Sequence, residues 1–163
     1  MRAVCLIAAL ALAGAAQAGV EAYDTCLTDG HEARVMGIFF ERFPHEDCEG
    51  PDCDPKLLES AIILARGQCR ARALDACESA KCRLGLGERW RADGAELRRE
   101  LEARIAELDL AALPALRARR FGNPALWISP HSCLGDATIC ESEAAGRALG
   151  DLERLFDEVM SVP

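Results

Sequence analysis

The sequence predicts an all-α fold, a small bundle of four to six helices held together by disulfide bonds. Ala, Leu, Glu and Arg are abundant, whereas aromatic residues make up 5% of the chain and β-branched residues are few, a composition that favours helices. Apolar residues recur at helical spacing in several segments that begin at capping residues. Nine cysteines in 163 residues supply the material for the disulfide bonds.

The first 18 residues, MRAVCLIAALALAGAAQA, are typical of a secretory signal peptide. They carry one positive charge, an apolar run too short to span a bilayer, and the small-x-small ending Ala16-Gln17-Ala18. We expect cleavage after Ala18, loss of Cys5 with the signal, and a single domain over residues 19–163. The predicted location is periplasmic or secreted, and no segment of the mature chain is predicted to span a membrane.

Two helices are predicted in the first half of the mature chain. One runs from His31 to Arg42. The other begins after Asp54, which can cap it, with Pro55 at the first helical position. Its apolar positions follow helical spacing. These positions are Leu57, Leu58, Ala61, Ile62 and Ala65.

This middle helix is predicted to continue to Leu84 and to stop at Gly85 and Gly87, and Gly67 marks a point where it could break. Asp93-Gly94-Ala95-Glu96 resembles a capping box, so the next helix is expected to start there. Its charged faces flank one apolar stripe, as in an amphipathic helix packed on a core. The stripe comprises Leu97, Leu101, Ile105 and Leu108.

The last third of the chain predicts two further helices. A short one begins near Pro114 and ends around Phe121-Gly122, and Asn123-Pro124 offers another cap and first helical position. The segment from Trp127 to Pro130 is expected to be irregular. A final helix would bury a stripe formed by Ala148, Leu149, Leu152, Leu155, Phe156 and Val159.

An even number of cysteines in an exported chain predicts a disulfide framework. The eight that remain after cleavage are Cys26, Cys48, Cys53, Cys69, Cys77, Cys82, Cys133 and Cys140. In a continuous helix Cys69, Cys77 and Cys82 would be separated by about 12 Å and about 7.5 Å, beyond the separation of about 7 Å that a disulfide allows. Either the helix breaks near Cys77 to Cys82, or at least one loop is joined to it. The connectivity stays open.

Charge limits the class of partner. The formal net charge is −8, and removal of Arg2 leaves 18 basic against 27 acidic side chains. Two acidic ends flank a mildly basic middle, which argues against a nucleic-acid partner. The ends could fold back onto arginines of the same domain, or an acidic face could steer a cationic partner. The arginines available for the first arrangement are Arg70, Arg72, Arg83 and Arg117 to Arg120.

No cofactor, metal or catalytic site is predicted. His45 with Cys48 and Cys53, or His131 with Cys133, could ligate zinc or copper, but oxidised cysteines are the preferred interpretation in an exported chain. The chain has neither a C-x-x-C pair nor the Gly and distal Glu that an EF-hand loop needs. Without a G-x-S-x-G elbow, the group Ser129, His131, Ser132 and Asp136 is typical of loop composition. We therefore expect a protein that is not an enzyme.

One segment resembles a known family. In SCLGDATICESEAAGRALGDLERLFDE, Cys133, Asp136, Ile139 and Cys140 follow the order found in the short repeat of the lysozyme-inhibitor LprI-like family. The leucines that supply the stripe of the following helix are Leu149, Leu152 and Leu155. The resemblance implies an exported helical protein that binds and inhibits a lysozyme.

An acidic binder suits a cationic lysozyme, because complementary charge raises the association rate. The candidate partner-binding residues lie in PHEDCEGPDCD, where Cys48 and Cys53 would hold the loop. These residues are Glu46, Asp47, Glu49, Asp52 and Asp54. The alternatives are a structural or interaction protein of the cell envelope, with this loop merely solvated, and a metal-binding protein that uses Cys and His.

Overall fold

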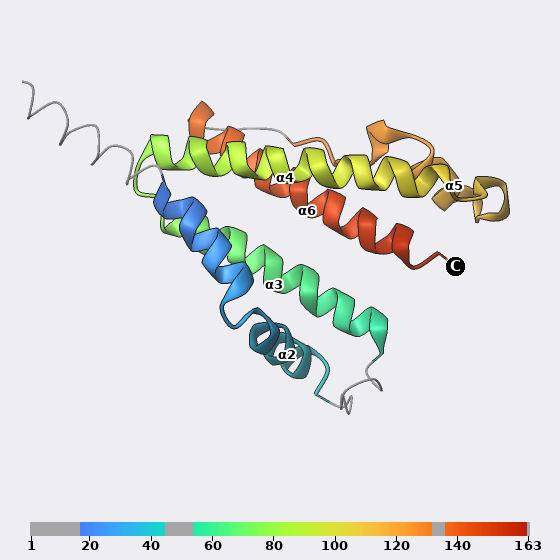
Figure 1. The fold of residues 1–163 in the computed structure, drawn as a ribbon, viewed down its shortest axis with the longest axis horizontal. Coiled ribbons are helices and arrows are strands. Elements are labelled where there is room, and N and C mark those ends of the chain that lie inside the picture. Colours follow the sequence, from blue (N-terminus) through green and yellow to red (C-terminus); the bar gives the residue numbers. More distant parts are fainter. Residues whose placement is uncertain (1–16, 45–53, 132–135, 163) are drawn as a thin grey trace, which may run out of the picture. The chain divides into compact units, whose positions relative to one another are not determined.

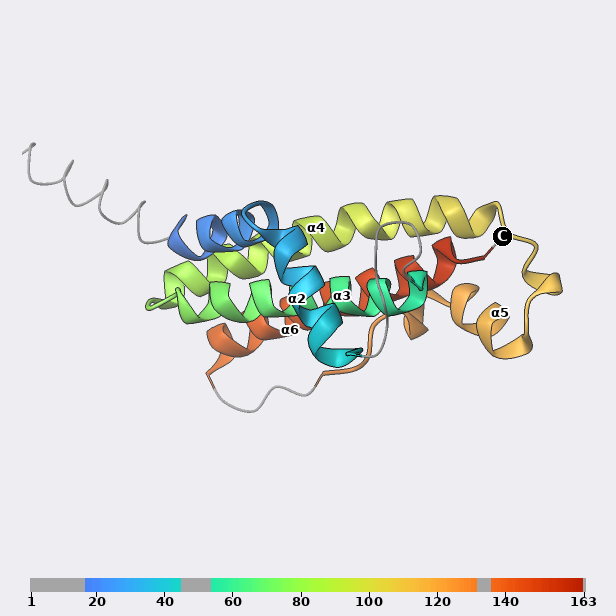
Figure 2. The same ribbon diagram turned by 90° about the horizontal axis from the view of Figure 1, so that it is seen from below.

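The computed structural model describes residues 17–44, 54–131 and 136–162, and helices are the only long regular elements there, with no strand among them (Figures 1 and 2). This confirms the all-α prediction. The elements are a helix over residues 17–28, α2 (His31–Arg42), α3 (Pro55–Asp75), α4 (Ala80–Ala106), α5 (Ala115–Phe121) and α6 (Ala137–Met160), with the 3-10 turns η2 (Leu110–Ala112) and η3 (Pro124–Leu126). No helix in the described residues is long and apolar enough to cross a bilayer.

The chain divides into two compact units, residues 1–86 and 87–163, and each is described by itself. The expectation of a single domain over residues 19–163 stays a prediction. So does cleavage after Ala18, since residues 1–16 lie outside the described part of the chain.

In the first unit, α2 packs beside α3 (Figures 1 and 2). Phe39 is fully buried, and its ring meets the Phe43 ring with centroids 5.5 Å apart. On the α3 side of the contact, Ala61 and Ala65 are fully buried, and four-residue spacing places them on one helix face. Larger α3 side chains pack around them, namely Leu57, Leu58, Ile62 and Leu64. The bulky α2 side chains therefore meet α3 where two alanines leave room.

The α3 helix begins as predicted, with Asp54 accepting a hydrogen bond from Lys56 N at 2.9 Å and Pro55 at the first position. It ends at Asp75, so the predicted continuation to Leu84 is wrong. The next helix begins at Ala80, where Ser79 Oγ accepts a hydrogen bond from Cys82 N at 3.2 Å. A side-chain cap thus divides the predicted middle helix into two.

The α4 helix runs through the glycines that were expected to end it, and it does not start at Asp93. A Cβ added at Gly87 would lie 3.1 Å from Ser142 Cα, and one at Gly94 would lie 3.5 Å from Leu152 Cδ1. Gly87 therefore serves close packing against α6, whereas a side chain at Gly94 would make only an ordinary contact. Tertiary contact of this kind overrides the weak helix propensity of glycine.

In the second unit α4 and α6 run in the same direction, because residues that increase in number along α4 meet residues that increase along α6. The pairs are Gly87 with Ser142, Trp90 with Gly146, and Gly94 with Leu152. Parallel neighbours need a long return connection, which contains η2, α5 and η3. The core they enclose comprises Leu101, Ile105, Phe121, Trp127, Leu152, Leu155, Val159 and Val162.

The return connection follows the predicted capping pattern. The α5 helix ends at Phe121, and Asn123 Oδ1 accepts a hydrogen bond from Ala125 N at 3.2 Å at the start of η3. Trp127 is buried, and its Nε1 donates to the carbonyl oxygens of Arg120 at 3.1 Å and Phe121 at 3.2 Å. The indole therefore satisfies carbonyls at the end of α5 while its ring fills the core.

Candidate functional site

Two disulfide bonds connect described cysteines, which confirms the disulfide prediction for these four residues. Cys26 is bonded to Cys69 with a Cα separation of 5.5 Å, and Cys77 is bonded to Cys82 with a Cα separation of 5.4 Å. The second bond is possible because α3 ends before Cys77. Cys140 is disulfide-bonded as well. Cys48, Cys53 and Cys133 lie outside the described residues.

The two bonds differ in the length of chain that they close. Cys26 and Cys69 are 43 residues apart, whereas Cys77 and Cys82 are 5 apart. Restriction of the unfolded chain predicts about 4 kcal/mol of stabilisation for the first bond and about 2 kcal/mol for the second. The Cys26–Cys69 bond therefore contributes more to stability.

The predicted partner-binding loop is largely outside the described part of the chain: Glu46, Asp47, Glu49 and Asp52 are not described, and neither are Cys48 and Cys53. Asp54 is described, and its carboxylate caps α3. A capping role accounts for Asp54 by itself, because Asp is among the preferred N-cap residues.

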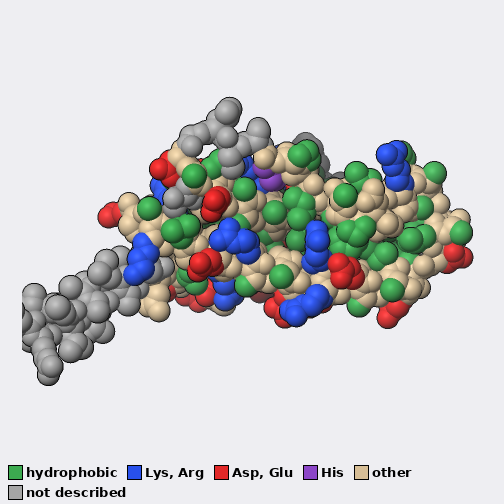
Figure 3. Space-filling view, turned by 90° about the horizontal axis from the view of Figure 1, so that it is seen from above, with side chains coloured by type: hydrophobic (Ala, Val, Ile, Leu, Met, Phe, Trp, Pro, Cys, Tyr) green, Lys and Arg blue, Asp and Glu red, His purple; other side chains and the backbone are tan. Residues whose placement is uncertain are grey.

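Described acidic and basic side chains alternate on the face drawn in Figure 3, and neither sign dominates it. One long-range ion pair supports the expectation that basic residues neutralise acidic ones of the last segment: Arg120 Nη1 lies 2.6 Å from Glu158 Oε2. Both side chains are partly exposed, so this pair adds little to stability.

A cavity of about 500 Å³ lies beside the Cys26–Cys69 bond in the first unit. The charges of its lining sum to zero, because two carboxylate and two guanidinium side chains border it. It is lined by Ala18, Glu21, Ala22, Thr25, Cys26, Asp29, Arg34 and Arg72. The predicted cleavage would remove Ala18 and leave the other seven in the mature chain. The volume is within the range of small-molecule sites.

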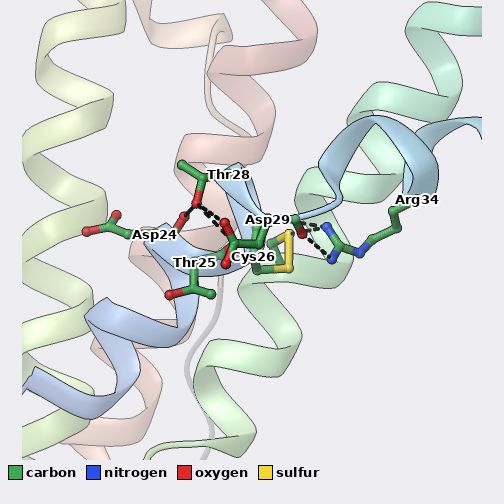
Figure 4. The surroundings of a disulfide bond; sticks show 7 residues. Asp24, Thr25, Cys26, Thr28, Asp29 and Arg34 are labelled. Atoms are coloured by element: carbon green, nitrogen blue, oxygen red, sulfur yellow. Dashed lines mark hydrogen bonds between the residues drawn. A yellow bond between two sulfur atoms is a disulfide. The ribbon is translucent and has the colours of Figure 1, made fainter.

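Arg34 of α2 reaches back to this bond (Figure 4). Its Nη1 donates to Cys26 O at 2.7 Å and lies 3.6 Å from Cys69 Sγ, and its Nη2 donates to Asp29 O at 3.4 Å. The guanidinium therefore satisfies carbonyls at the end of the helix over residues 17–28, where the helix dipole favours a cation.

Positive charges of α2 and α3 act on His31, close to Arg34 in the chain. Burial lowers the pKa of His31, and the positive charges of Arg66 and Arg34 lower it further. The same field favours a negative charge on any group that can ionise beside Arg34.

A second cavity, of about 340 Å³, lies between α4 and α6 in the second unit. Its walls are mainly apolar, and the guanidinium side chains of Arg91 and Arg98 border it. The residues that line it are Trp90, Arg91, Gly94, Ala95, Arg98, Ile128, Ala145, Ala148, Leu149 and Leu152. Arg98 is also placed over the Trp127 ring, 5.6 Å from its centroid, so this cation already has an aromatic partner.

Ser129 and His131 lie near Asp151 of α6. Ser129 N donates to Asp151 Oδ2 at 2.8 Å, and His131 Nε2 lies 3.7 Å from the same oxygen. Asp136 is placed elsewhere, since its side chain accepts a hydrogen bond from Ile139 N at 3.2 Å in the first turn of α6. The arrangement joins the segment before residue 132 to α6. Among the described members of the group, Ser129 and His131 both approach Asp151, and Ser132 lies outside the described residues.

The carboxylate of Asp151 is almost fully buried. Burial alone would raise its pKa, but hydrogen bonds from Ser129 and Arg154 outweigh that effect, so the pKa of Asp151 lies below its usual value. Asp151 is therefore a charged, satisfied anchor at neutral pH.

Among the described residues, no group of three or more His, Cys, Asp and Glu side chains could hold a metal ion. The candidate ligands His45, Cys48, Cys53 and Cys133 lie outside those residues. The absence of metal and cofactor sites stays a prediction.

Sequence reasoning missed Arg34 and Asp151 as organising residues. Arg34 lies at the start of a predicted helix, where an arginine is usually expected to be exposed to solvent. The hydrogen bonds of its side chain are made to residues that precede it in the chain. Asp151 is one of the polar positions between the predicted leucines of α6. In both cases the contacting residues come close to one another only in the folded chain.

No family model, curated protein or solved structure matches the chain. The resemblance to the lysozyme-inhibitor LprI-like family therefore stays a prediction.

Proposed function

We propose that the protein is an exported, acidic, disulfide-stabilised helical binding protein whose partner is a cationic protein, specifically a lysozyme. The observation that carries the proposal is the pair of disulfide bonds, Cys26–Cys69 and Cys77–Cys82, because such bonds persist in oxidising compartments. The predicted signal peptide supports the same location.

The acid-rich stretch supports the choice of a cationic partner. It ends at Asp54, whose side chain caps α3, so one end of the stretch is attached to a defined helix. The formal net charge of −8 would raise the rate of encounter with a basic hydrolase at low salt.

The residues that resemble the family repeat occupy structural positions. Leu152 and Leu155 are buried in the core of the second unit, Leu149 is buried on the same helix, and Asp136 caps the first turn of α6. Because these residues support the fold, we place the contact with lysozyme on the acidic loop.

The test is inhibition of cell-wall lysis by a lysozyme, measured with the oxidised mature protein at rising salt. The expected result is stoichiometric inhibition that weakens as salt screens the charges. A variant with Glu46→Gln, Asp47→Asn, Glu49→Gln and Asp52→Asn should lose most of it. Asp54 is left unchanged, since its substitution would also remove a helix cap.

The matched control neutralises the same number of exposed carboxylates on α4, through Glu88→Gln, Glu96→Gln, Glu100→Gln and Glu102→Gln. It should retain inhibition. Unchanged lysis in the presence of micromolar protein would exclude the lysozyme proposal, and equal loss in both variants would indicate a non-specific charge effect.

Two further measurements separate the alternatives. Recovery of a partner other than a muramidase from periplasmic extract would favour an envelope interaction protein. An intact mass that rises by about 8 Da on reduction corresponds to four disulfides, since each bond gains two hydrogens. A native mass with bound zinc or copper and no such shift would favour metal binding.

A further inference from the structure

The two sulfurs of the Cys26–Cys69 bond have different surroundings. Cys26 lines the cavity of about 500 Å³, whereas Cys69 is fully buried and does not line it. A small reagent that enters the cavity therefore meets Cys26 first. Glu21 and Asp29 balance the charges of Arg34 and Arg72 in the lining, which suits an uncharged or zwitterionic reagent.

The opposite sulfur has a cation beside it. Arg34 Nη1 lies 3.6 Å from Cys69 Sγ, and hydrogen bonds to Cys26 O and Asp29 O hold the guanidinium in place (Figure 4). Burial alone would raise the pKa of a Cys69 thiol, whereas a nearby cation stabilises its thiolate.

We propose that the Cys26–Cys69 bond is a thiol-exchange site, at which a small-molecule thiol forms a mixed disulfide with Cys26 and Arg34 stabilises the Cys69 thiolate that leaves. The attacking thiol loses its proton to solvent and forms a sulfur–sulfur bond to Cys26 Sγ. The bond between Cys26 and Cys69 breaks, and its electron pair stays on Cys69 Sγ. A second thiol then releases Cys26 and forms the small-molecule disulfide.

The expected direction of the Arg34 effect follows from leaving-group chemistry. A cation beside the leaving sulfur stabilises its thiolate. Exchange is faster when the leaving thiol has a lower pKa, so Arg34 should raise the rate of exchange. Arg34 is thus a positioning residue, and Cys26 is the site of modification.

The Cys77–Cys82 bond supplies an internal comparison. Both of its cysteines are almost fully buried, and neither lines the cavity. The nearby guanidinium of Arg83 is directed to backbone, with Nε 3.4 Å from Cys77 O. This bond should therefore exchange more slowly than Cys26–Cys69.

The experiment incubates the folded, oxidised protein with 2-mercaptoethanol, an uncharged thiol, quenches with acid, and locates mixed disulfides by peptide mass spectrometry. The adduct is expected on Cys26 while Cys77–Cys82 remains intact. Arg34→Gln should slow its formation several-fold, and Arg34→Lys should retain most of the rate. Arg72→Gln, which removes a positive charge from the same lining, should change the rate less than Arg34→Gln.

A second readout separates charge from structural loosening. In Cys26→Ser the Cys69 thiol is free, and its titration is followed by thiolate absorbance against a Cys26→Ser/Cys69→Ser blank. The pKa of Cys69 should rise when Arg34→Gln is added. An adduct on Cys69, first opening of Cys77–Cys82, or an Arg34→Gln variant with unchanged or faster exchange would overturn the proposal, and so would an unchanged pKa of Cys69.

Discussion

Gly146 of α6 has no room for a side chain beside Trp90, and Gly146→Ala should destabilise the protein. A Cβ at this position would lie 2.7 Å from Cζ3 and 2.8 Å from Cε3 of Trp90. Trp90 is fully buried, and its ring packs against Gly146 on one side and borders the cavity of about 340 Å³. The substitution therefore forces either α6 or the indole to move.

Two effects of opposite sign set the magnitude. Replacing a helical glycine by alanine normally stabilises a helix by about 0.5 to 1 kcal/mol. Overpacking a well-packed core costs about 1 to 3 kcal/mol. Because the added methyl would press on a rigid aromatic ring, overpacking should win, and we expect a net loss of about 1 to 2 kcal/mol.

Urea unfolding followed by tryptophan fluorescence is the suitable assay. The chain has two tryptophans, Trp90 and Trp127, and both belong to the second unit, so their emission reports on that unit. Gly94→Ala is the matched control in α4, since its Cβ would lie 3.5 Å from Leu152 Cδ1, an ordinary contact. That variant should be neutral or up to about 1 kcal/mol more stable.

A double-mutant cycle isolates the contact. Trp90→Leu removes the ring that the methyl would meet, so adding Gly146→Ala to Trp90→Leu should cost much less than adding it to the wild-type protein. Trp127 still reports unfolding in that background. If Gly146→Ala were as stable as wild type, or equally destabilising with and without Trp90, the packing explanation would be wrong.

Four further outcomes are expected. Gly19→Val should slow formation of the Cys77–Cys82 bond in an oxidative refolding assay, because a Cβ at Gly19 would collide with Cys77 Sγ. Gly67→Ala should raise the melting temperature, because its added Cβ would meet nothing nearer than 3.9 Å. Asp54→Ala should lower stability by about 1 kcal/mol in a denaturant titration through loss of the α3 cap. The pKa of Asp151 is lower in the folded protein than in the unfolded chain. The ionised carboxylate therefore stabilises the fold at pH values above the unfolded pKa, and this stabilisation is lost as the pH falls through the folded pKa. Asp151→Asn should make the free energy of unfolding depend less steeply on pH in the acid range.

Helix starts with a side-chain cap were predictable from the sequence. Asp54-Pro55 and Asn123-Pro124 each place a carboxylate or amide before a proline, and each caps a helical turn in the structure. The cap at Ser79 was not predicted, and the middle helix was instead expected to run on to Leu84. The Ser79 hydroxyl decides the helix boundary, and that boundary in turn decides that Cys77 and Cys82 can bond.

The candidate sites were less predictable, because they depend on contacts between residues distant in sequence. The formation of disulfides was predictable from the even number of cysteines and the predicted export of the chain. Which cysteine bonds to which was not predictable. The cavity beside Cys26 is built by the helix over residues 17–28, part of which was assigned to the signal peptide and the rest to no element. Arg34 joins it only after the turn at Gly30, whose φ of 66° directs α2 back towards Cys69.

The glycines of α4 show how one residue type can carry two opposite meanings. Considered one at a time, Gly87 and Gly94 favour helix ends, because glycine has low helix propensity. Considered together, they are seven residues apart and therefore lie two turns apart on the same helix face, where small residues let a neighbouring helix approach. On α6, Gly146 leaves room for the ring of Trp90, which lies between Gly87 and Gly94 in the α4 sequence. The seven-residue spacing is therefore the signal that separates packing from termination. The contrast between Gly146→Ala and Gly94→Ala measures how strongly the fold depends on the close approach of Gly146 to Trp90.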